Sequence, residues 1–320
     1  MENKIDYLRF SLTDRCNLNC IYCTPLQKSQ FLSHDEILSY EEITKVVALF
    51  VKAGIRKLRL TGGEPLTKRN ITELITMLKG IKGLEDLSMT TNGVYLEGLA
   101  ESLKESGLDR INISIDTLKK EKFKRITGFD YFDNVWHGIE KALKAGLTPV
   151  KLNVILMKGI NDDEISDFAR LTLDFPLVIR FIELFPTNKR SVKFAGSSIK
   201  NEEVKKRITG DFGIMERVTN VKGNGPAQYC KIKDSKGSIG FISSYSKNFC
   251  GKCNRIRIDC AGRVSPCLFS KPAYDLRHLL RNAQDDEALL EIIKDIFEIK
   301  PKFKKDTIHK PQLEMSSIGG

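Results

Sequence analysis

The sequence predicts an α/β protein, built as an incomplete (β/α)6 TIM-type barrel followed by a smaller α+β extension. Over roughly the first two-thirds of the chain, short strand-like runs alternate with amphipathic stretches. This alternation indicates a parallel sheet covered by helices. From about Lys222 the pattern changes to short polar strands. We therefore expect a barrel unit over residues 1–221 and an extension over 222–320, with six βα units where a complete barrel has eight.

The individual elements follow from local patterns. Strands are predicted over 7–13, 57–63, 87–93, 110–116, 149–157 and 177–184. The clearest helices between them cover 39–54, 70–80 and 132–146, and each of these stretches ends in glycine, a common helix stop. In the extension, strands are predicted over 227–234, 238–244 and 255–260, followed by two helices, one of them over 286–300.

Four of the predicted strands have one apolar and one polar face. In the first, Leu8, Phe10 and Leu12 alternate with Arg9 and Ser11, so the two sets point to opposite sides of the sheet. Parallel strands covered by helices are normally apolar on both faces, and a barrel interior is normally packed. A polar interior instead predicts a ligand-filled lumen, and its cations are Arg9, Lys57, Arg59 and Lys151. The alternative is an antiparallel sheet with one face in water.

Charge and composition narrow the class of protein. Among 320 residues, 52 are Lys or Arg and 41 are Asp or Glu, which gives a net charge of +11. This excess indicates an anionic partner, and cations inside a lumen favour a compact polyanion over a nucleic acid backbone. No apolar run is long enough to span a membrane, and the N-terminus lacks the apolar core of a signal peptide. We expect a cytoplasmic protein with no membrane or nucleic acid partner.

The cysteines point to metal chemistry. Eight cysteines in a reducing compartment are better suited to metal ligation or catalysis than to disulfides. Cys16, Cys20 and Cys23 follow the first strand, at the carboxyl end where barrel sites are built. Three thiolates can hold three irons of a [4Fe–4S] cluster and leave the fourth iron open to another ligand.

A second set comprises Cys250, Cys253 and Cys267. With Cys260 it would form a four-thiolate zinc site, which is the alternative. However, Cys260 alternates with Arg257 and Asp259 and shares the apolar side of its strand with Ile258. We therefore interpret Cys260, and likewise Cys230, as small residues that pack in the core.

The segment "CNLNCIYC", with "LTGGEPL" after the second strand, resembles the radical S-adenosylmethionine (SAM) superfamily. The second cysteine set, "FCGKCNRIRID" and the terminal double glycine narrow the resemblance to the GTP 3′,8-cyclase (MoaA) family over nearly the whole chain. The resemblance implies two [4Fe–4S] clusters and SAM as cofactors. A 5′-deoxyadenosyl radical would remove hydrogen from ribose C3′ of GTP, and the carbon radical would attack guanine C8. The product would be (8S)-3′,8-cyclo-7,8-dihydroguanosine 5′-triphosphate, in the first step of molybdenum cofactor biosynthesis.

The resemblance also implies roles for particular residues. SAM would contact Tyr22, Gly63, Ser114 and Phe185. GTP would contact Arg9, Lys57, Arg59, Thr90, Lys151, Arg255 and Arg257. Gly319 and Gly320 would enter the active site; the alternative is a frayed chain end. The chain departs from the family at Thr24 and at Phe185, where methionine is typical.

The resemblance implies an electron donor protein, a downstream cyclic pyranopterin monophosphate synthase and a homodimer. Two alternatives stay open at this point. One is another radical SAM enzyme with an auxiliary cluster, such as a peptide-modifying enzyme. The other is a basic zinc-binding nucleic-acid module, which would carry Lys and Arg in surface stripes with interleaved aromatic residues.

Overall fold

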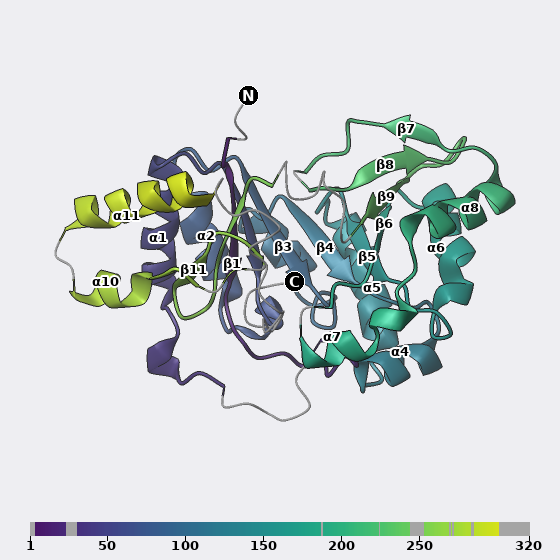
Figure 1. Ribbon diagram of the computed structural model, residues 1–320, viewed down its shortest axis with the longest axis horizontal. Coiled ribbons are helices and arrows are strands. Elements are labelled where there is room, and N and C mark those ends of the chain that lie inside the picture. Colours follow the sequence, from purple (N-terminus) through teal and green to yellow (C-terminus); the bar gives the residue numbers. More distant parts are fainter. Residues whose placement is uncertain are drawn as a thin grey trace.

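The described strands of the computed structural model form a single twelve-stranded sheet (Figure 1). The structure describes residues 4–23, 31–186, 188–223, 225–243, 253–268, 270, 272–282 and 285–300. Along the sheet the strands follow the order β12-β11-β10-β1-β2-β3-β4-β5-β6-β9-β8-β7. The eight neighbouring strands from β10 to β9 in this order pair in parallel. At one edge β11 and β12, and at the other edge β8 and β7, pair antiparallel.

The six strands predicted for the first unit are confirmed and lie side by side in sequence order. They are β1 (Tyr7–Ser11), β2 (Lys57–Thr61), β3 (Asp86–Thr91), β4 (Arg110–Ser114), β5 (Lys151–Ile155) and β6 (Val178–Ile182). Neighbours in this group pair in parallel. The alternative of an antiparallel sheet with one face in water is therefore wrong for this part of the chain.

The later strands widen the same sheet at both edges. β9 (Ser238–Ile242) pairs in parallel with β6, and β10 (Arg255–Ile258) pairs in parallel with β1. The flanking strands are β7 (Glu216–Val218), β8 (Gln228–Lys231), β11 (Arg263–Ser265) and β12 (Tyr274–Asp275). The parallel part of the sheet thus has two more strands than the six predicted for the barrel, because β10 alternates basic and apolar residues as β1 does and fits beside it.

Helices connect the parallel strands and cover the sheet. They are α1 (Tyr40–Lys52), α2 (Ile71–Lys79), α3 (Ala100–Glu105), α4 (Lys120–Thr127), α5 (Phe132–Lys144), α6 (Ile165–Asp174), α7 (Lys189–Lys193), α8 (Asn201–Phe212), α10 (Leu276–Asn282) and α11 (Asp286–Ile299). Short 3-10 turns lie at His34–Glu36, Pro65–Thr67, Asp162–Glu164 and Ala195–Ser197. The late helix α11 packs on α1 (Figure 1), where the rings of Phe50 and Phe297 are 6.1 Å apart.

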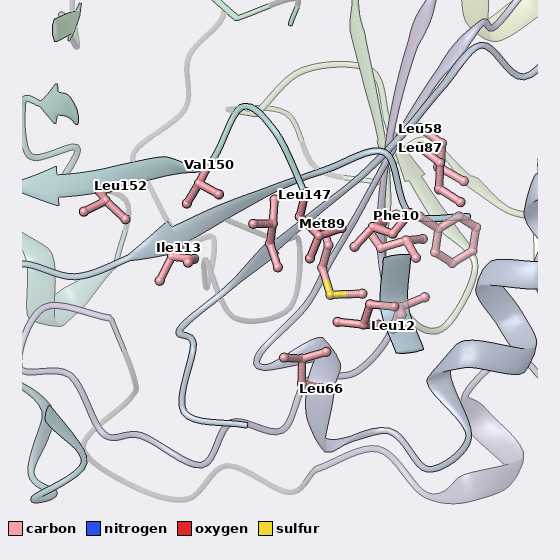
Figure 2. Packing of buried hydrophobic residues seen from close by; sticks show 14 of the residues in the cluster. Phe10, Leu12, Leu58, Leu66, Leu87, Met89, Ile113, Leu147, Val150 and Leu152 are labelled. Atoms are coloured by element: carbon pink, nitrogen blue, oxygen red, sulfur yellow. The ribbon is translucent and has the colours of Figure 1, made fainter. Parts of the chain in front are cut away.

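The apolar strand faces form the core beneath these helices, as predicted. Leu8, Phe10 and Leu12 are inaccessible to solvent, and they pack with the apolar residues of β2 and β3 (Figure 2). Burial of such side chains contributes about 25 cal/mol for each Å² of apolar surface removed from water. No helix within the described ranges is both long enough and apolar enough to cross a membrane.

Candidate active site

The polar strand faces meet in one pocket. The cavity has a volume of about 280 Å³, and every one of the eight parallel strands contributes to its wall. The cysteine segment, defined here as residues 14–23, closes the pocket beyond the carboxyl end of β1. Residues from the polar faces of the predicted strands, Arg9 and Arg59 among them, therefore line a pocket.

Cys16, Cys20 and Cys23 all line this pocket. Backbone hydrogen bonds attach their segment to α4, since Asn19 N–H donates to Thr127 O at 2.8 Å and Ile21 N–H donates to Ile126 O at 2.9 Å. On the other side, α7 supports it. The Asn188 side chain donates to Cys23 O at 3.0 Å, and Arg190 donates to Cys20 O at 3.2 Å. The three thiols are thus held in place by two helices that are distant in sequence.

The surroundings of these thiols disfavour a thiolate that has no positive partner. Burial raises the pKa of Cys16 to about 11, and burial and then the neighbouring Cys23 raise the pKa of Cys20 well above its ordinary value. Thiolates here need a compensating positive charge, which iron supplies. In the described part of the chain, no three Cys, His, Asp or Glu side chains converge on a single metal ion. In a [4Fe–4S] cluster, by comparison, each of three cysteines binds a different iron.

Gly62 and Gly63 line the pocket next to the cysteine segment. A Cβ on Gly63 would lie 2.0 Å from Arg15 O, and one on Gly62, whose φ is +149°, would lie 2.7 Å from Thr13 O. In addition, Gly63 N–H donates to Thr13 O at 2.7 Å. These glycines are therefore required because two backbone segments pack directly on each other. The sequence motif alone suggests a different reason, namely close approach of the cofactor.

Glu64 is a buried carboxylate that the sequence analysis did not single out. It accepts hydrogen bonds from Thr91 Oγ1 at 2.6 Å and from the backbone N–H groups of Leu66 and Asn92 at 2.9 and 2.6 Å. Burial raises its pKa to about 7, against the lowering effect of these donors. The Asn92 side chain in turn donates to Asn17 Oδ1 at 2.7 Å. Glu64 thereby connects β2, β3 and the cysteine segment.

Tyr22 and Asp116 form a second buried polar pair in the pocket wall. The Tyr22 hydroxyl donates to Asp116 Oδ2 at 2.5 Å, and Ile155 N–H donates to Asp116 Oδ1 at 2.8 Å. Burial raises the pKa of Asp116 to about 6. Ser114, at the end of β4, and Phe185, which follows β6, also line the pocket. The structure thus brings all four residues assigned to SAM, including Gly63, into the lining of the pocket that the cysteines share.

The predicted arginines converge on the same pocket. Arg9 on β1 is in register with Arg59 on β2 and with Arg257 on β10, and all three are at least nine-tenths buried. Arg255 and Thr90 complete this part of the lining. Burial, and then the charge of Arg255, lower the pKa of Arg257 to about 10. Mutually repelling guanidinium groups in a buried cavity are a site for a polyanion.

The two predicted lysines are placed differently from these arginines. Lys57 does not line the pocket; its Nζ lies 2.8 Å from Asp6 Oδ2, because both residues lie at the amino end of the sheet. Lys151 is buried just behind the lining, where its Nζ donates to Lys222 O at 2.5 Å and lies 3.3 Å from the Tyr229 hydroxyl. Burial, and then the charge of Arg180, lower the pKa of Lys151 to about 6.

Arg180 on β6 is a pocket cation that the sequence analysis missed. Its side chain is buried, lines the pocket, and donates to Asn112 Oδ1 at 3.0 Å and to Asn153 Oδ1. The signal was present, because Arg180 interrupts an otherwise apolar strand. Arg110 on β4 was also missed, but its guanidinium is paired with Asp86 at 2.8 and 2.5 Å.

The second cysteine set borders the basic part of the pocket. Cys253 precedes β10, and Leu268, which follows Cys267, lines the pocket. Burial raises the pKa of Cys253, but Arg255 and Lys300 lower it to about 7, with Lys300 Nζ 3.6 Å from the sulfur. Cys260 is buried and Cys230 packs against the hydrophobic core, so the packing roles predicted for both are confirmed. Cys250, Gly319, Gly320 and Thr24 lie outside the described residues.

Comparisons with known proteins agree with this geometry. The family model "Radical SAM superfamily" matches residues 10–172, and "Molybdenum Cofactor Synthesis C" matches residues 177–305. The GTP 3′,8-cyclases of Heliobacterium modesticaldum and Thermodesulfovibrio yellowstonii are each 44% identical over 99% of this chain and 98% of their own. Among solved structures, Streptococcus suis SuiB bound to its precursor peptide SuiA gives a TM-score of 0.61 at 14% identity, covering 97% of this chain and 76% of its own. The last similarity establishes the fold alone.

Proposed function

The chain belongs to the GTP 3′,8-cyclase family, and we propose that the pocket described above is where GTP and SAM meet. As a member it is a radical SAM enzyme that converts GTP to (8S)-3′,8-cyclo-7,8-dihydroguanosine 5′-triphosphate. This reaction is the first step of molybdenum cofactor biosynthesis. The observation that carries the site assignment is the convergence of five arginine residues, four of them buried, and three cysteines on one cavity.

Cys16, Cys20 and Cys23 would hold the first [4Fe–4S] cluster, with SAM at the open iron. When bound, these groups supply the radical that removes the hydrogen atom from ribose C3′. The chain's own residues fix the arrangement. Gly63 and Glu64, after β2, and the Tyr22–Asp116 pair and Ser114, near the end of β4, line the pocket together with the cysteines. Phe185 would pack on the cofactor in place of the methionine typical of the family.

The arginines would bind the triphosphate. Arg9, Arg59 and Arg180 come from three different strands and are buried, so they can surround phosphate oxygens while excluding water. Arg255 and Arg257 lie on β10, next to the second cysteine set, and would orient the nucleotide between the triphosphate and the base. Thr90 would contact the substrate from β3. Lys151 and Lys57 would add positive charge from behind this lining, where Lys151 contacts Tyr229 and Lys57 contacts Asp6.

Cys250, Cys253 and Cys267 would hold a second [4Fe–4S] cluster whose open iron binds guanine. The depressed pKa of Cys253 supports this assignment, because a thiol near neutrality becomes a metal ligand at small cost. Residues 1–221 would then form an incomplete TIM-type barrel, and residues 222–320 the unit that carries this cluster. Gly319 and Gly320 would enter the pocket, where the missing side chains allow close approach.

Three partners follow from the family reaction. An electron donor protein would reduce the first cluster, and a cyclic pyranopterin monophosphate synthase would consume the product. A homodimer is proposed from the family resemblance, and light scattering of the purified protein would test it.

The decisive experiment is anaerobic. The protein is reconstituted with iron and sulfide, and SAM and a strong chemical reductant are added with and without GTP. We expect 5′-deoxyadenosine to form in a GTP-dependent way while GTP is consumed. Equal formation with and without GTP would keep the first cluster but remove GTP as the substrate of this pocket.

A further inference from the structure

Exposed apolar side chains gather around the cysteine segment. Among the described residues, the large hydrophobic side chains that are exposed are Phe31, Tyr95, Phe129, Tyr131, Val192 and Ile214. All except Ile214 lie on segments that adjoin residues 14–23. For example, the Arg15 guanidinium lies 5.6 Å from the Phe31 ring, and Tyr95 follows Asn92, which donates to Asn17. Such grouping marks an interaction site more often than chance exposure does.

Two of these segments border the same point of the cysteine segment. At the end of α4, Thr127 O accepts a hydrogen bond from Asn19 N–H at 2.8 Å. On α7, the Arg190 guanidinium donates to Asn19 Oδ1 at 2.9 Å. Figure 1 shows α4 and α7 close together at this end of the molecule. Asn19 is exposed between them and directly precedes Cys20. The surface formed by α4 and α7 therefore contacts the residue next to Cys20, which is a proposed cluster ligand.

The apolar part of this surface consists of the exposed side chains of Phe129, Tyr131 and Val192. The rings of Phe129 and Tyr131 stack at 5.7 Å with an angle of 9°, while 40% and 37% of their surfaces remain exposed. On α7, Val192 is 51% exposed. Exposed aromatic rings with little freedom to move are typical contact residues of protein interfaces.

The charged part of the surface is basic. Arg125, Lys189 and Lys193 are exposed, and within the ranges that the structure describes none of them forms an ion pair. The nearby carboxylate of Asp130 is already engaged, since it lies 3.7 Å from Lys124 Nζ. A positive rim around an apolar centre attracts and orients an acidic protein.

We propose that Arg125, Phe129, Tyr131, Lys189, Val192 and Lys193 form a docking surface for an acidic one-electron carrier protein that reduces the first cluster. This inference rests on the proposed function, because it needs the cluster at Cys16, Cys20 and Cys23. In the electron transfer step the carrier is oxidised by one electron and the cluster is reduced by the same electron, with no proton or atom transferred. The location next to Cys20 keeps the path for the electron short.

The test separates docking from catalysis. The reconstituted holoenzyme, without SAM or GTP, is mixed with an acidic flavodoxin in its hydroquinone form, and bleaching of the cluster absorbance is followed by stopped flow. A Lys189→Glu/Lys193→Glu variant should be reduced on the order of tenfold more slowly at low salt, and the difference should shrink as salt is raised. Reduction by dithionite, which needs no docking surface, should change less than about twofold.

A matched control carries the same change of charge elsewhere. Lys82, in the turn before β3, and Lys144, the last residue of α5 before β5, are exposed near the amino ends of these strands, at the opposite end of the sheet. The Lys82→Glu/Lys144→Glu variant should be reduced by flavodoxin at the unsubstituted rate. Equal slowing in both variants would mean that net charge alone matters and would overturn the proposal. Equal slowing with dithionite would overturn it as well, since the cluster itself would be perturbed.

A second variant guards against misfolding. Lys189→Gln/Lys193→Gln removes charge without adding any, and exposed positions of this kind tolerate substitution with little loss of stability. It should show a smaller slowing with flavodoxin and none with dithionite. An unchanged flavodoxin rate in both α7 variants would exclude this surface, whether or not GTP is the substrate.

Discussion

Cys16 and Cys20 of the first cysteine set and Cys253 of the second lie in opposite electrostatic surroundings. At the first set, burial raises the pKa of Cys16 and Cys20, and the carboxylates of Glu64 and Asp116 add to the rise. At the second set, Arg255 and Lys300 outweigh burial and lower the pKa of Cys253 to about 7. One end of the pocket therefore favours positive groups, such as iron and a sulfonium, and the other favours a polyanion. Two sets of three cysteines that border one cavity are therefore found beside surroundings suited to differently charged ligands.

Replacing a cysteine gives the largest expected effect and tests whether each set has three ligands or four. Cys20→Ala should reduce 5′-deoxyadenosine formation to background and lower the iron content, because a cluster ligand is lost. Cys260→Ala should retain both, because Cys260 is buried in the core. Iron analysis and product assays on the two variants provide the measurement. A fall in metal content in Cys260→Ala would instead support a four-thiolate zinc site.

Replacing an arginine tests only the basic end of the pocket, where GTP is proposed to bind. Arg180→Ala and Arg257→Ala should each weaken GTP binding by roughly 10- to 100-fold, since a charge-assisted hydrogen bond is worth about 1.5–3 kcal/mol. Iron content should stay the same, because neither residue is a metal ligand. Equilibrium dialysis with GTP and with guanosine provides the measurement. The loss should be absent for guanosine, and an equal loss for both ligands would count against phosphate contacts.

Lys151, near the basic end of the pocket, is expected to make the stability of the fold depend on pH. Its folded pKa of about 6 lies below its ordinary value of 10.5, so between these values the unfolded chain binds more protons than the folded one. Lys151 therefore makes stability rise as pH increases from about 6 toward 10.5. Lys151→Met should be more stable than the unsubstituted protein near pH 6, and this advantage should shrink at higher pH. Urea unfolding at several pH values measures this, and parallel curves would contradict the depressed pKa.

The smallest effect on stability is expected at the end of the pocket that contains the first cysteine set. Tyr22→Phe removes the hydroxyl that donates to Asp116, although Ile155 N–H still binds that carboxylate. The free energy of unfolding should fall by about 1–2 kcal/mol. The pKa of Asp116 should rise further, because its hydrogen bond from Tyr22 lowers it. Denaturant titration of Tyr22→Phe, with the exposed Tyr95→Phe as control, checks the result; equal losses would mean the pair contributes nothing specific.

Much of the fold followed from local patterns. The order of β1 to β6 and the division of each strand into an apolar and a polar face were predicted because residue alternation depends only on neighbouring positions. The same rule found Arg9 and Arg59 but was not applied to Arg180, which interrupts an apolar strand. It grouped Lys57 with the arginines, because alternation gives the face of a strand and says nothing about how deep a residue lies along it.

By itself, the sequence determined the cysteine spacing, the strand phase and the excess of positive charge, all of which are local or additive properties. Only the tertiary structure decided that β9 and β10 extend the sheet on both sides, and that β10 places Arg257 beside Arg9 and Arg255 beside Tyr7. It also decided that Gly63 packs on the cysteine segment and that Glu64 and Asp116 are buried beside the thiols. These features depend on contacts between residues far apart in the chain, because burial and charge–charge distances exist only once the sheet has curved around the pocket.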